Sequence, residues 1–303
     1  MELGFMALGN VDKTDLSIKL NESFYKLDPS EKNKVSYSIG TGLTKIFSEE
    51  FLDVPWLGHV STFNNVVNWR GKKIPSKVIL HNSNKTPKEP DLIGYDSSGN
   101  PHVLEAKGYS SGFKGNVLQH AINQVSQVSD VAGRPPKTKV ACFNDLSKKP
   151  FVANIVDPII EGNEGCSLNI SFEQLIESYY KFFDSLEFRE ISEEVSIGSK
   201  LYRVIYLPEV DCCFGIDLEL IKTSSNLHDF TLAYSNTNFE REFLKFNELY
   251  SENINFGKDG TFFARREFLL NFNYFSGSNF EGLFNVHSLS NSLFDEKNQL
   301  MHT

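Results

Sequence analysis

The stretch that decides the fold is EPDLIGYDSSGNPHVLEAKGY, residues 89–109. Its centre, DSSGN at 96–100, consists of turn-forming residues. Apolar residues flank this turn on both sides: Leu92, Ile93, Val103 and Leu104. The pattern predicts a β-hairpin. If the turn is symmetric about its middle, Asp91 lies directly opposite Glu105, and Lys107 stands beside Glu105 because alternate residues of a strand share a face.

One face of the predicted hairpin therefore carries two carboxylates and an ammonium group. Carboxylates that lie opposite each other, roughly 4.5–5.5 Å apart at Cβ, repel and stay ionised readily only with a cation between them. Hard oxygen ligands suit Mg²⁺. A lysine beside such a cation can orient a water molecule or stabilise charge that develops on a phosphate. The pattern predicts metal-assisted hydrolysis of a phosphodiester bond.

This arrangement resembles the PD-(D/E)xK nuclease superfamily, which has the restriction-endonuclease-like fold, through Pro90, Asp91, Glu105 and Lys107. The resemblance implies a DNA endonuclease in which Asp91 and Glu105 hold Mg²⁺ or Mn²⁺, with the Ala106 carbonyl as a third oxygen ligand. Lys107 would position or activate the attacking water. The implied setting is bacterial restriction or antiphage defence. The alternative is a solvated hairpin with a surface ion pair, worth about 0–1 kcal/mol.

The elements around the hairpin are predicted from periodicity and from turn residues. A helix is expected over 33–52, a strand over 73–81, a second helix over 114–132 and a further strand over 138–144. With the two hairpin strands, this gives the order helix, strand, strand, strand, helix, strand. The resemblance implies the same order, so we expect an α/β fold with a mixed sheet of the α+β kind.

Two further residues are candidates for this site. Glu50 follows Ile46 by four residues on the apolar stripe of the first helix, and the resemblance implies an acid on such a helix near the metal. Gln124 lies at the margin of the apolar stripe of the second helix, from which the superfamily often directs a glutamine to the site; His120 is a weaker candidate. The alternatives are a helix-end acid that reaches solvent and polar groups satisfied at the rim of a core.

The charge distribution favours a polyanionic partner for the first half of the chain. The whole chain of 303 residues has a net charge of −9. Residues 1–150 nevertheless carry 19 basic and 15 acidic residues, a net charge of +4, whereas residues 151–303 carry 11 and 24, a net charge of −13. Clustered basic groups attract a polyanion, so Lys72, Lys73 and Lys114 are predicted to bind DNA phosphates. The alternative is a solvated charged surface.

The change of character near Pro150 predicts two domains, a nuclease-like domain at 1–150 and an accessory α+β domain at 151–303 that is acidic and rich in aromatic residues. The second domain is expected to regulate the first or to dock a partner such as a helicase or ATPase subunit. The alternative function for the whole chain is a catalytically inactive, nuclease-like adaptor in a nucleic-acid-processing complex.

Other patterns narrow the class of protein. The sequence has no apolar run near 18 residues and no secretory signal at its start, so no membrane span is expected. Its four cysteines show no C-x-x-C spacing, which predicts a reduced, cytoplasmic protein. A P-loop, a dinucleotide-binding glycine motif and a G-x-S-x-G motif are all absent from the sequence, which disfavours NTPases, dehydrogenases and serine hydrolases.

Overall fold

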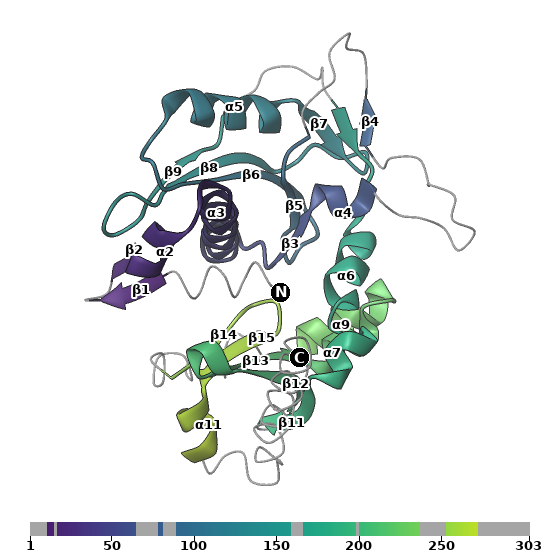
Figure 1. Cartoon of the computed structure of the whole chain (residues 1–303). Coiled ribbons are helices and arrows are strands. Elements are labelled where there is room, and N and C mark those ends of the chain that lie inside the picture. Colours follow the sequence, from purple (N-terminus) through teal and green to yellow (C-terminus); the bar gives the residue numbers. More distant parts are fainter. Residues whose placement is uncertain are drawn as a thin grey trace, which may run out of the picture. The chain divides into compact units, whose positions relative to one another are not determined.

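The computed structural model describes seven stretches of the chain: residues 11–14, 17–64, 78–80, 89–158, 166–197, 200–236 and 253–271. The chain divides into two compact units, Met1–Leu175 and Ile176–Thr303. Each unit combines helices with a β-sheet (Figure 1). The predicted mixed α+β class is therefore confirmed.

A five-stranded mixed sheet forms the centre of the first unit. In spatial order its strands are β3 (Trp56–His59), β5 (Leu92–Tyr95), β6 (Pro101–Tyr109), β8 (Thr138–Asp145) and β9 (Val152–Val156). Strands β6 and β8 run parallel, and the other neighbours run antiparallel. The parallel pair requires a crossover connection, and the chain between β6 and β8 includes helix α5 (Gly115–Ser126).

Helices cover both faces of this sheet. Figure 1 shows α5 on one face and α3 (Pro29–Leu52) on the other. The face toward α3 is apolar, with Leu104 and Ala106 of β6 buried in a cluster against which Phe47 packs. Because side chains alternate along a strand, Glu105 and Lys107 belong to the opposite face from Leu104 and Ala106.

The predicted hairpin is confirmed in detail. Strands β5 and β6 pair antiparallel from Leu92 opposite Leu104 to Tyr95 opposite Pro101, a register symmetric about Ser98. The Asp96 carboxylate accepts hydrogen bonds from the backbone N–H groups of Ser98 and Asn100 at 3.0 and 2.8 Å. Gly99 adopts the left-handed conformation with φ of 74°, which glycine reaches without strain.

Helix α3 begins four residues earlier than its apolar periodicity predicts, because local capping sets the start. Asp28 caps the helix, accepting N–H groups of Ser30 and Glu31, and the Glu31 side chain accepts the N–H of Asp28 in return. Pro29 occupies the first turn, where its missing N–H costs nothing. These residues form a capping box, which a search for apolar spacing alone does not detect.

Two glycines let α3 approach β6 closely. A Cβ on Gly40 would lie 2.7 Å from the Gly108 backbone, and a Cβ on Gly108 would lie 1.9 Å from the Ser36 carbonyl oxygen. Neither contact is compatible with a larger residue. The backbone of β6 just after Lys107 therefore lies directly against the middle of α3.

Two predicted elements differ from the structure. The described part of the strand expected at 73–81 is β4 (Val78–Leu80), which pairs with β10 (Cys166–Leu168) in a separate three-stranded sheet. The strand next to the hairpin is instead β3, a four-residue strand too short for a clear periodic signal. The helix expected over 114–132 ends at Ser126, because Val128–Val131 forms β7 and pairs in parallel with β10.

Pairing across residue 150 places the division between the units later than the expected boundary. Strand β9 pairs with β8, and β10 pairs with β7, so Val152–Val156 and Cys166–Leu168 complete sheets of the first unit. The other elements of this unit are β1 (Val11–Thr14), β2 (Ser17–Leu20), α2 (Glu22–Lys26), α4 (Val60–Asn64) and the start of α6 (Phe172–Lys181).

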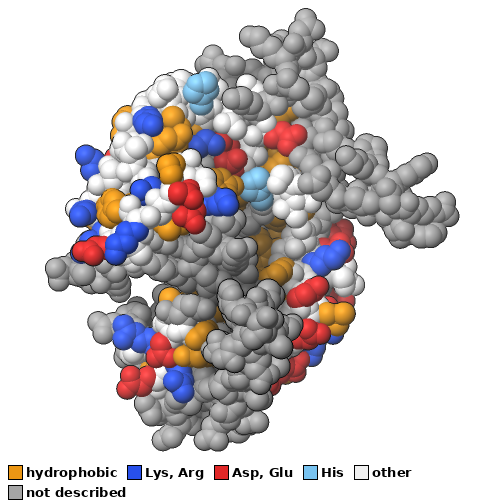
Figure 2. Space-filling model, viewed as in Figure 1, with side chains coloured by type: hydrophobic (Ala, Val, Ile, Leu, Met, Phe, Trp, Pro, Cys, Tyr) orange, Lys and Arg blue, Asp and Glu red, His pale blue; other side chains and the backbone are white. Residues whose placement is uncertain are grey.

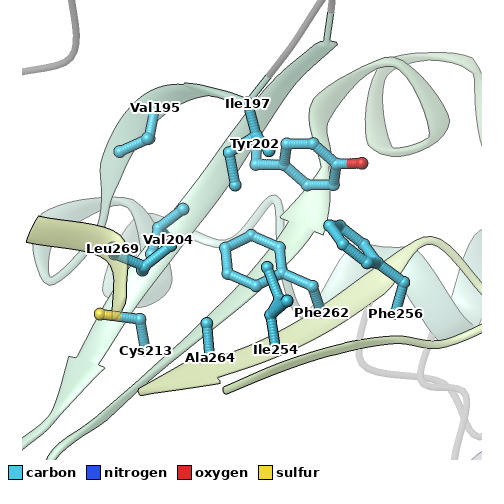
Figure 3. Close-up of a cluster of buried hydrophobic side chains, with 10 residues drawn as sticks. All are labelled: Val195, Ile197, Tyr202, Val204, Cys213, Ile254, Phe256, Phe262, Ala264 and Leu269. Atoms are coloured by element: carbon cyan, nitrogen blue, oxygen red, sulfur yellow. The ribbon is translucent and has the colours of Figure 1, made fainter. Parts of the chain in front are cut away.

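The second unit contains an antiparallel five-stranded sheet. In spatial order its strands are β11 (Glu193–Ile197), β12 (Lys200–Leu207), β13 (Cys212–Asp217), β15 (Thr261–Arg265) and β14 (Ile254–Phe256). Buried aromatic rings of Tyr202, Phe256 and Phe262 pack together within its core (Figure 3). The remaining elements are α7 (Leu186–Glu190), η1 (Pro208–Val210), α8 (Leu218–Thr223), α9 (Leu227–Asn236) and α11 (Arg266–Asn271). The aromatic residues named here thus have a packing role, as expected for such side chains.

None of the helices in the described stretches is long and apolar enough to cross a membrane.

Candidate active site

Three of the predicted site residues converge where the hairpin opens. Lys107 Nζ lies 3.2 Å from Asp91 Oδ2 and forms an ion pair with Glu105 Oε1. The other oxygen of Glu105, Oε2, accepts the backbone N–H of Asp91 at 2.7 Å. Asp91, Glu105 and Lys107 therefore form one connected cluster of charges.

The hairpin register explains this convergence. The pairing of β5 with β6 ends with Leu92 opposite Leu104. The next position in the same register places Asp91 opposite Glu105. The Asp91 N–H is bound by the Glu105 side chain, while the Asp91 carbonyl accepts the N–H of Val60 at 2.9 Å. The main chain of Asp91 is thus held by hydrogen bonds on both of its polar groups, and its carboxylate is held by the contact with Lys107.

The three side chains of the cluster differ in how deeply they are buried. The side chain of Glu105 is fully buried, whereas those of Asp91 and Lys107 are 20% and 24% exposed. Burial, followed by the negative charge of Asp91, raises the pKa of Glu105 to about 7 despite the opposing effect of Lys107. For Lys107, burial disfavours the charge, but the attraction of Glu105 and Asp91 outweighs it and raises the pKa. Lys107 therefore remains an ammonium group at neutral pH.

The donor set fits a hard divalent cation that keeps part of its water shell. Within the described stretches, no group of three or more His, Cys, Asp or Glu side chains is placed so that it could hold a metal ion. Two carboxylates are sufficient for Mg²⁺, which proteins commonly bind through one or two carboxylates and several waters. Asp91 and Glu105 would provide these, and a cation between them would offset the repulsion that disfavours ionisation of Glu105.

Two predicted metal ligands have different outcomes. The Ala106 carbonyl, which lies between Glu105 and Lys107 in the chain, stays a predicted ligand, while the Ala106 side chain is buried in the apolar cluster on the α3 side. Glu50 is exposed and lies outside the cluster. The contact of α3 with the Lys107 backbone is at Gly40, and ten helical residues separate Gly40 from Glu50 by about 15 Å along the axis.

Glu50 was expected to face the core because it follows Ile46 by four residues, but the face of α3 that carries Ile46 is not the buried one. The side chain of Ile46, four residues before Glu50, is itself 57% exposed, whereas Val35 and Ile39 are buried and Phe47 packs against the core. Ile46 and Glu50 therefore share an exposed face of α3.

Gln124 contacts the segment that carries Asp91 but is not hydrogen-bonded to the carboxylates. Its side-chain amide donates a hydrogen bond to the Glu89 carbonyl at 3.0 Å. This bond fastens α5 to the chain two residues before Asp91, which is a positioning contact. His120, the weaker candidate on the same helix, is exposed.

Tyr37 and His59 are neighbours of the cluster that the sequence analysis did not identify. His59 is the strand partner of Leu92, next to Asp91, and its Nε2 lies 2.9 Å from the Tyr37 hydroxyl. His59 Nδ1 accepts the N–H of Ser61 at 3.2 Å, so in neutral imidazole the proton is on Nε2 and is donated to Tyr37. Burial, followed by the charge of Asp91, raises the pKa of Tyr37.

No sequence signal marked these two residues. Tyr37 is off the apolar stripe of its helix, and His59 ends the short strand β3, whose pairing with the hairpin depends on tertiary structure. Their proximity to Asp91 arises only when α3 and β3 pack around the start of β5.

The predicted phosphate-binding lysines are only partly described. Lys114 is exposed, with its Nζ 5.1 Å from the centre of the Tyr109 ring. Lys72 and Lys73 lie outside the described residues. On the face shown in Figure 2, basic and acidic side chains are interspersed over the first unit.

Comparison of the chain with protein-family models, with curated proteins and with solved structures gave no match. The functional assignment consequently rests on the geometry of the charged cluster. Two carboxylates and an ammonium group in mutual contact can bind a divalent cation, a phosphate ester or both.

Proposed function

We propose that the chain is a Mg²⁺- or Mn²⁺-dependent DNA endonuclease of the PD-(D/E)xK type. The observation that carries the proposal is the contact of Lys107 with both Asp91 and Glu105 at the opening of the hairpin. Within the central sheet and its two covering helices, the chain order α3, β3, β5, β6, α5 and β8 supports it, with α4, β4 and β7 inserted between these elements, because the resemblance implies a helix, three strands, a helix and a strand around such a cluster.

Asp91 and Glu105 would hold the cation in this proposal. When bound, the cation would supply positive charge at the phosphate and a water of lowered pKa. Glu105 would provide the buried ligand, fixed by the Asp91 N–H, and Asp91 would provide the more accessible one. Lys107 would orient the attacking water or donate a hydrogen bond to a non-bridging phosphate oxygen.

Tyr37 and His59 would border the same substrate position. The phenol of Tyr37 stays protonated at neutral pH because its pKa is raised above an ordinary value of 10.0. A protonated phenol is able to donate a hydrogen bond to a phosphate oxygen. The N–H of His59 that is donated to Tyr37 would fix the orientation of this hydroxyl.

Cleavage of supercoiled plasmid in Mg²⁺ or Mn²⁺ tests the proposal. Wild type should nick or linearise the plasmid, and EDTA or Lys107→Ala should abolish the reaction. Lys45→Ala is a matched control, because the side chain of Lys45 is also 24% exposed and is also paired with a carboxylate, that of Glu49 at 2.7 Å. Equal cleavage by wild type and Lys107→Ala, or none by wild type across both metals and both single- and double-stranded DNA, would contradict it.

A second candidate is the inactive, nuclease-like adaptor. The observation that favours it is that Lys107 is already paired with both carboxylates through direct contacts, while the described stretches contain no group of three or more acids, histidines or cysteines that could hold a metal ion. An adaptor of this kind would join a helicase or ATPase subunit through its acidic second half. Titration calorimetry with Mn²⁺ separates the two candidates, since an adaptor does not require a metal at Asp91 and Glu105.

A further inference from the structure

Three aromatic rings form a continuous cluster beside the charged site. Tyr109 follows Lys107 by two residues on β6 and so shares its face, and Phe143 is the strand partner of Lys107 on β8. The rings of Tyr109 and Phe143 stack with centroids 5.3 Å apart and an angle of 21°. Phe113 adds a third ring, edge-on to Phe143 at 5.1 Å and 72°.

Phe113 is the exposed member of this cluster. Phe143 is fully buried, whereas Phe113 is 51% exposed. The chain positions this ring with unusual backbone geometry, since Gly112, just before it, has φ of 93°, a conformation that favours glycine. The buried ring of Phe143 packs against Phe113, and about half of the surface of Phe113 remains open to a ligand.

The chain segment that carries Phe113 favours an anionic ligand, and the nearest acid across the sheet, Asp145 opposite Tyr109, is buried. Lys114, the next residue, holds its ammonium 5.1 Å from the centre of the Tyr109 ring. From Ala106 to Ser129 the sequence contains two lysines, Lys107 and Lys114, and no acid. Helix α5 within this stretch carries no Asp, Glu, Lys or Arg, so a polyanion following it meets no repulsive side chain of that helix.

We propose that Phe113 stacks on an unpaired base and that Lys114 contacts the adjoining phosphate of single-stranded DNA whose neighbouring phosphate reaches Lys107. This inference deepens the proposed nuclease function and rests on it for the identity of the cleaved strand. Aromatic side chains beside basic groups bind single strands through stacking and charge. In an intact duplex the base faces are already stacked, so Phe113 selects DNA that is single-stranded, frayed or locally opened.

Binding without cleavage provides the test. Fluorescence anisotropy of labelled oligo-dT is measured in EDTA with the full chain, and Phe113→Ala should weaken binding roughly 5- to 100-fold, the usual effect of losing one base stack. Phe113→Trp should retain affinity. Lys114→Ala should weaken binding and reduce the slope of log affinity against log salt by about 0.7. A duplex of equal length should bind Phe113→Ala as it binds wild type.

Phe51→Ala is the matched control. Phe51 is 76% exposed and stacks on a neighbouring ring, that of Phe47 at 5.4 Å, near the end of α3. Its loss should leave oligo-dT binding unchanged. Melting curves of all variants identify any loss that arises from unfolding, and Phe113→Trp retains an aromatic ring at the site under test.

Different results would contradict the stacking site and the proposed nuclease function. Wild-type affinity of Phe113→Ala for oligo-dT, an equal loss in Phe51→Ala, or no binding of oligo-dT by wild type would overturn the stacking site, even if plasmid is cleaved. If the protein binds oligo-dT through Phe113 but cleaves no DNA, the result would support the stacking site and contradict the proposed nuclease function.

Discussion

The buried carboxylate of Glu105 accepts the backbone N–H of Asp91 at 2.7 Å, while its other oxygen forms an ion pair with Lys107. One side chain thus fixes the main chain of one site residue and neutralises another. Because Glu105 is fully buried and adjacent to a second carboxylate, its ionisation is costly, and its pKa rises to about 7. This relationship makes stability sensitive to pH and to cations.

Stability of the metal-free protein should fall as the pH rises from about 5 to 8. A carboxyl whose folded pKa exceeds its unfolded value binds more protons when folded, so it favours folding at low pH, and this contribution is lost as the pH rises through the folded pKa. The change from 4.5 to about 7 corresponds to about 3 kcal/mol of unfolding free energy. Urea denaturation in EDTA at several pH values should show this decrease in wild type and not in Glu105→Gln.

Asp96, at the turn of the same hairpin, serves as a control for this pH dependence, because its pKa is shifted in the opposite direction to that of Glu105. Burial opposes its charge, but hydrogen bonds from Lys137 and Asn100 outweigh burial and lower the pKa of Asp96 to about 2. Its contribution to stability is therefore present above pH 4 and is lost as the pH falls toward 2. Asp96→Asn should therefore lower the free energy of unfolding by a constant amount above pH 4 and remove this acidic limb, while leaving the decrease between pH 5 and 8 in place. A decrease above pH 5 that persists in Glu105→Gln would exclude Glu105 as its source.

Divalent cations should stabilise wild type through the two carboxylates. Mn²⁺ should raise the melting temperature of wild type, because a ligand that binds only the folded state shifts the folding equilibrium. Asp91→Asn and Glu105→Gln should leave stability in EDTA unchanged or slightly raised, since each removes one of two repelling charges, and both should abolish the response to Mn²⁺. Lys107→Ala should lower stability in EDTA modestly by leaving the acid pair without its cation.

A structural ion pair would give the reverse pattern. Loss of either acid would then lower the melting temperature in EDTA, and Mn²⁺ would have no effect on wild type. That result would contradict the proposal that Asp91 and Glu105 bind a metal ion.

The hairpin and its charges were predictable because their signals are local. The turn residues at 96–100, flanked by apolar residues on both sides, predict the register that the structure has, and this register places Asp91 next to Glu105. Glu50 was expected on the buried face of its helix but is exposed, as in the alternative of a helix-end acid that reaches solvent, because the buried stripe runs through Phe47 and not through Ile46. Tyr37 and His59 were missed because their approach depends on the packing of α3 and β3, and nothing local in the sequence encodes it.

The close contact of α3 with β6 predicts opposite effects for two glycines of one helix. Gly40→Ala should destabilise the protein by several kcal/mol, because its Cβ would lie 2.7 Å from the Gly108 backbone. Gly42→Ala should stabilise by up to about 1 kcal/mol, since no neighbouring atom lies within 4 Å of its Cβ and alanine favours helix. Urea denaturation measures both. Equal effects of the two substitutions would show that α3 does not contact β6 at Gly40.

Tyr37→Phe should separate catalysis from folding. It removes only the hydroxyl that His59 contacts at 2.9 Å, so the melting temperature in EDTA should change little, because Tyr37 is partly exposed. Loss of one hydrogen bond to a charged phosphate costs roughly 1.5–3 kcal/mol, which predicts a 10- to 100-fold lower rate of plasmid cleavage. His59→Ala, which removes the group that orients the hydroxyl, should have a smaller effect in wild type and none in the Tyr37→Phe background. Additive losses in the double variant would show that His59 acts on the substrate independently of Tyr37.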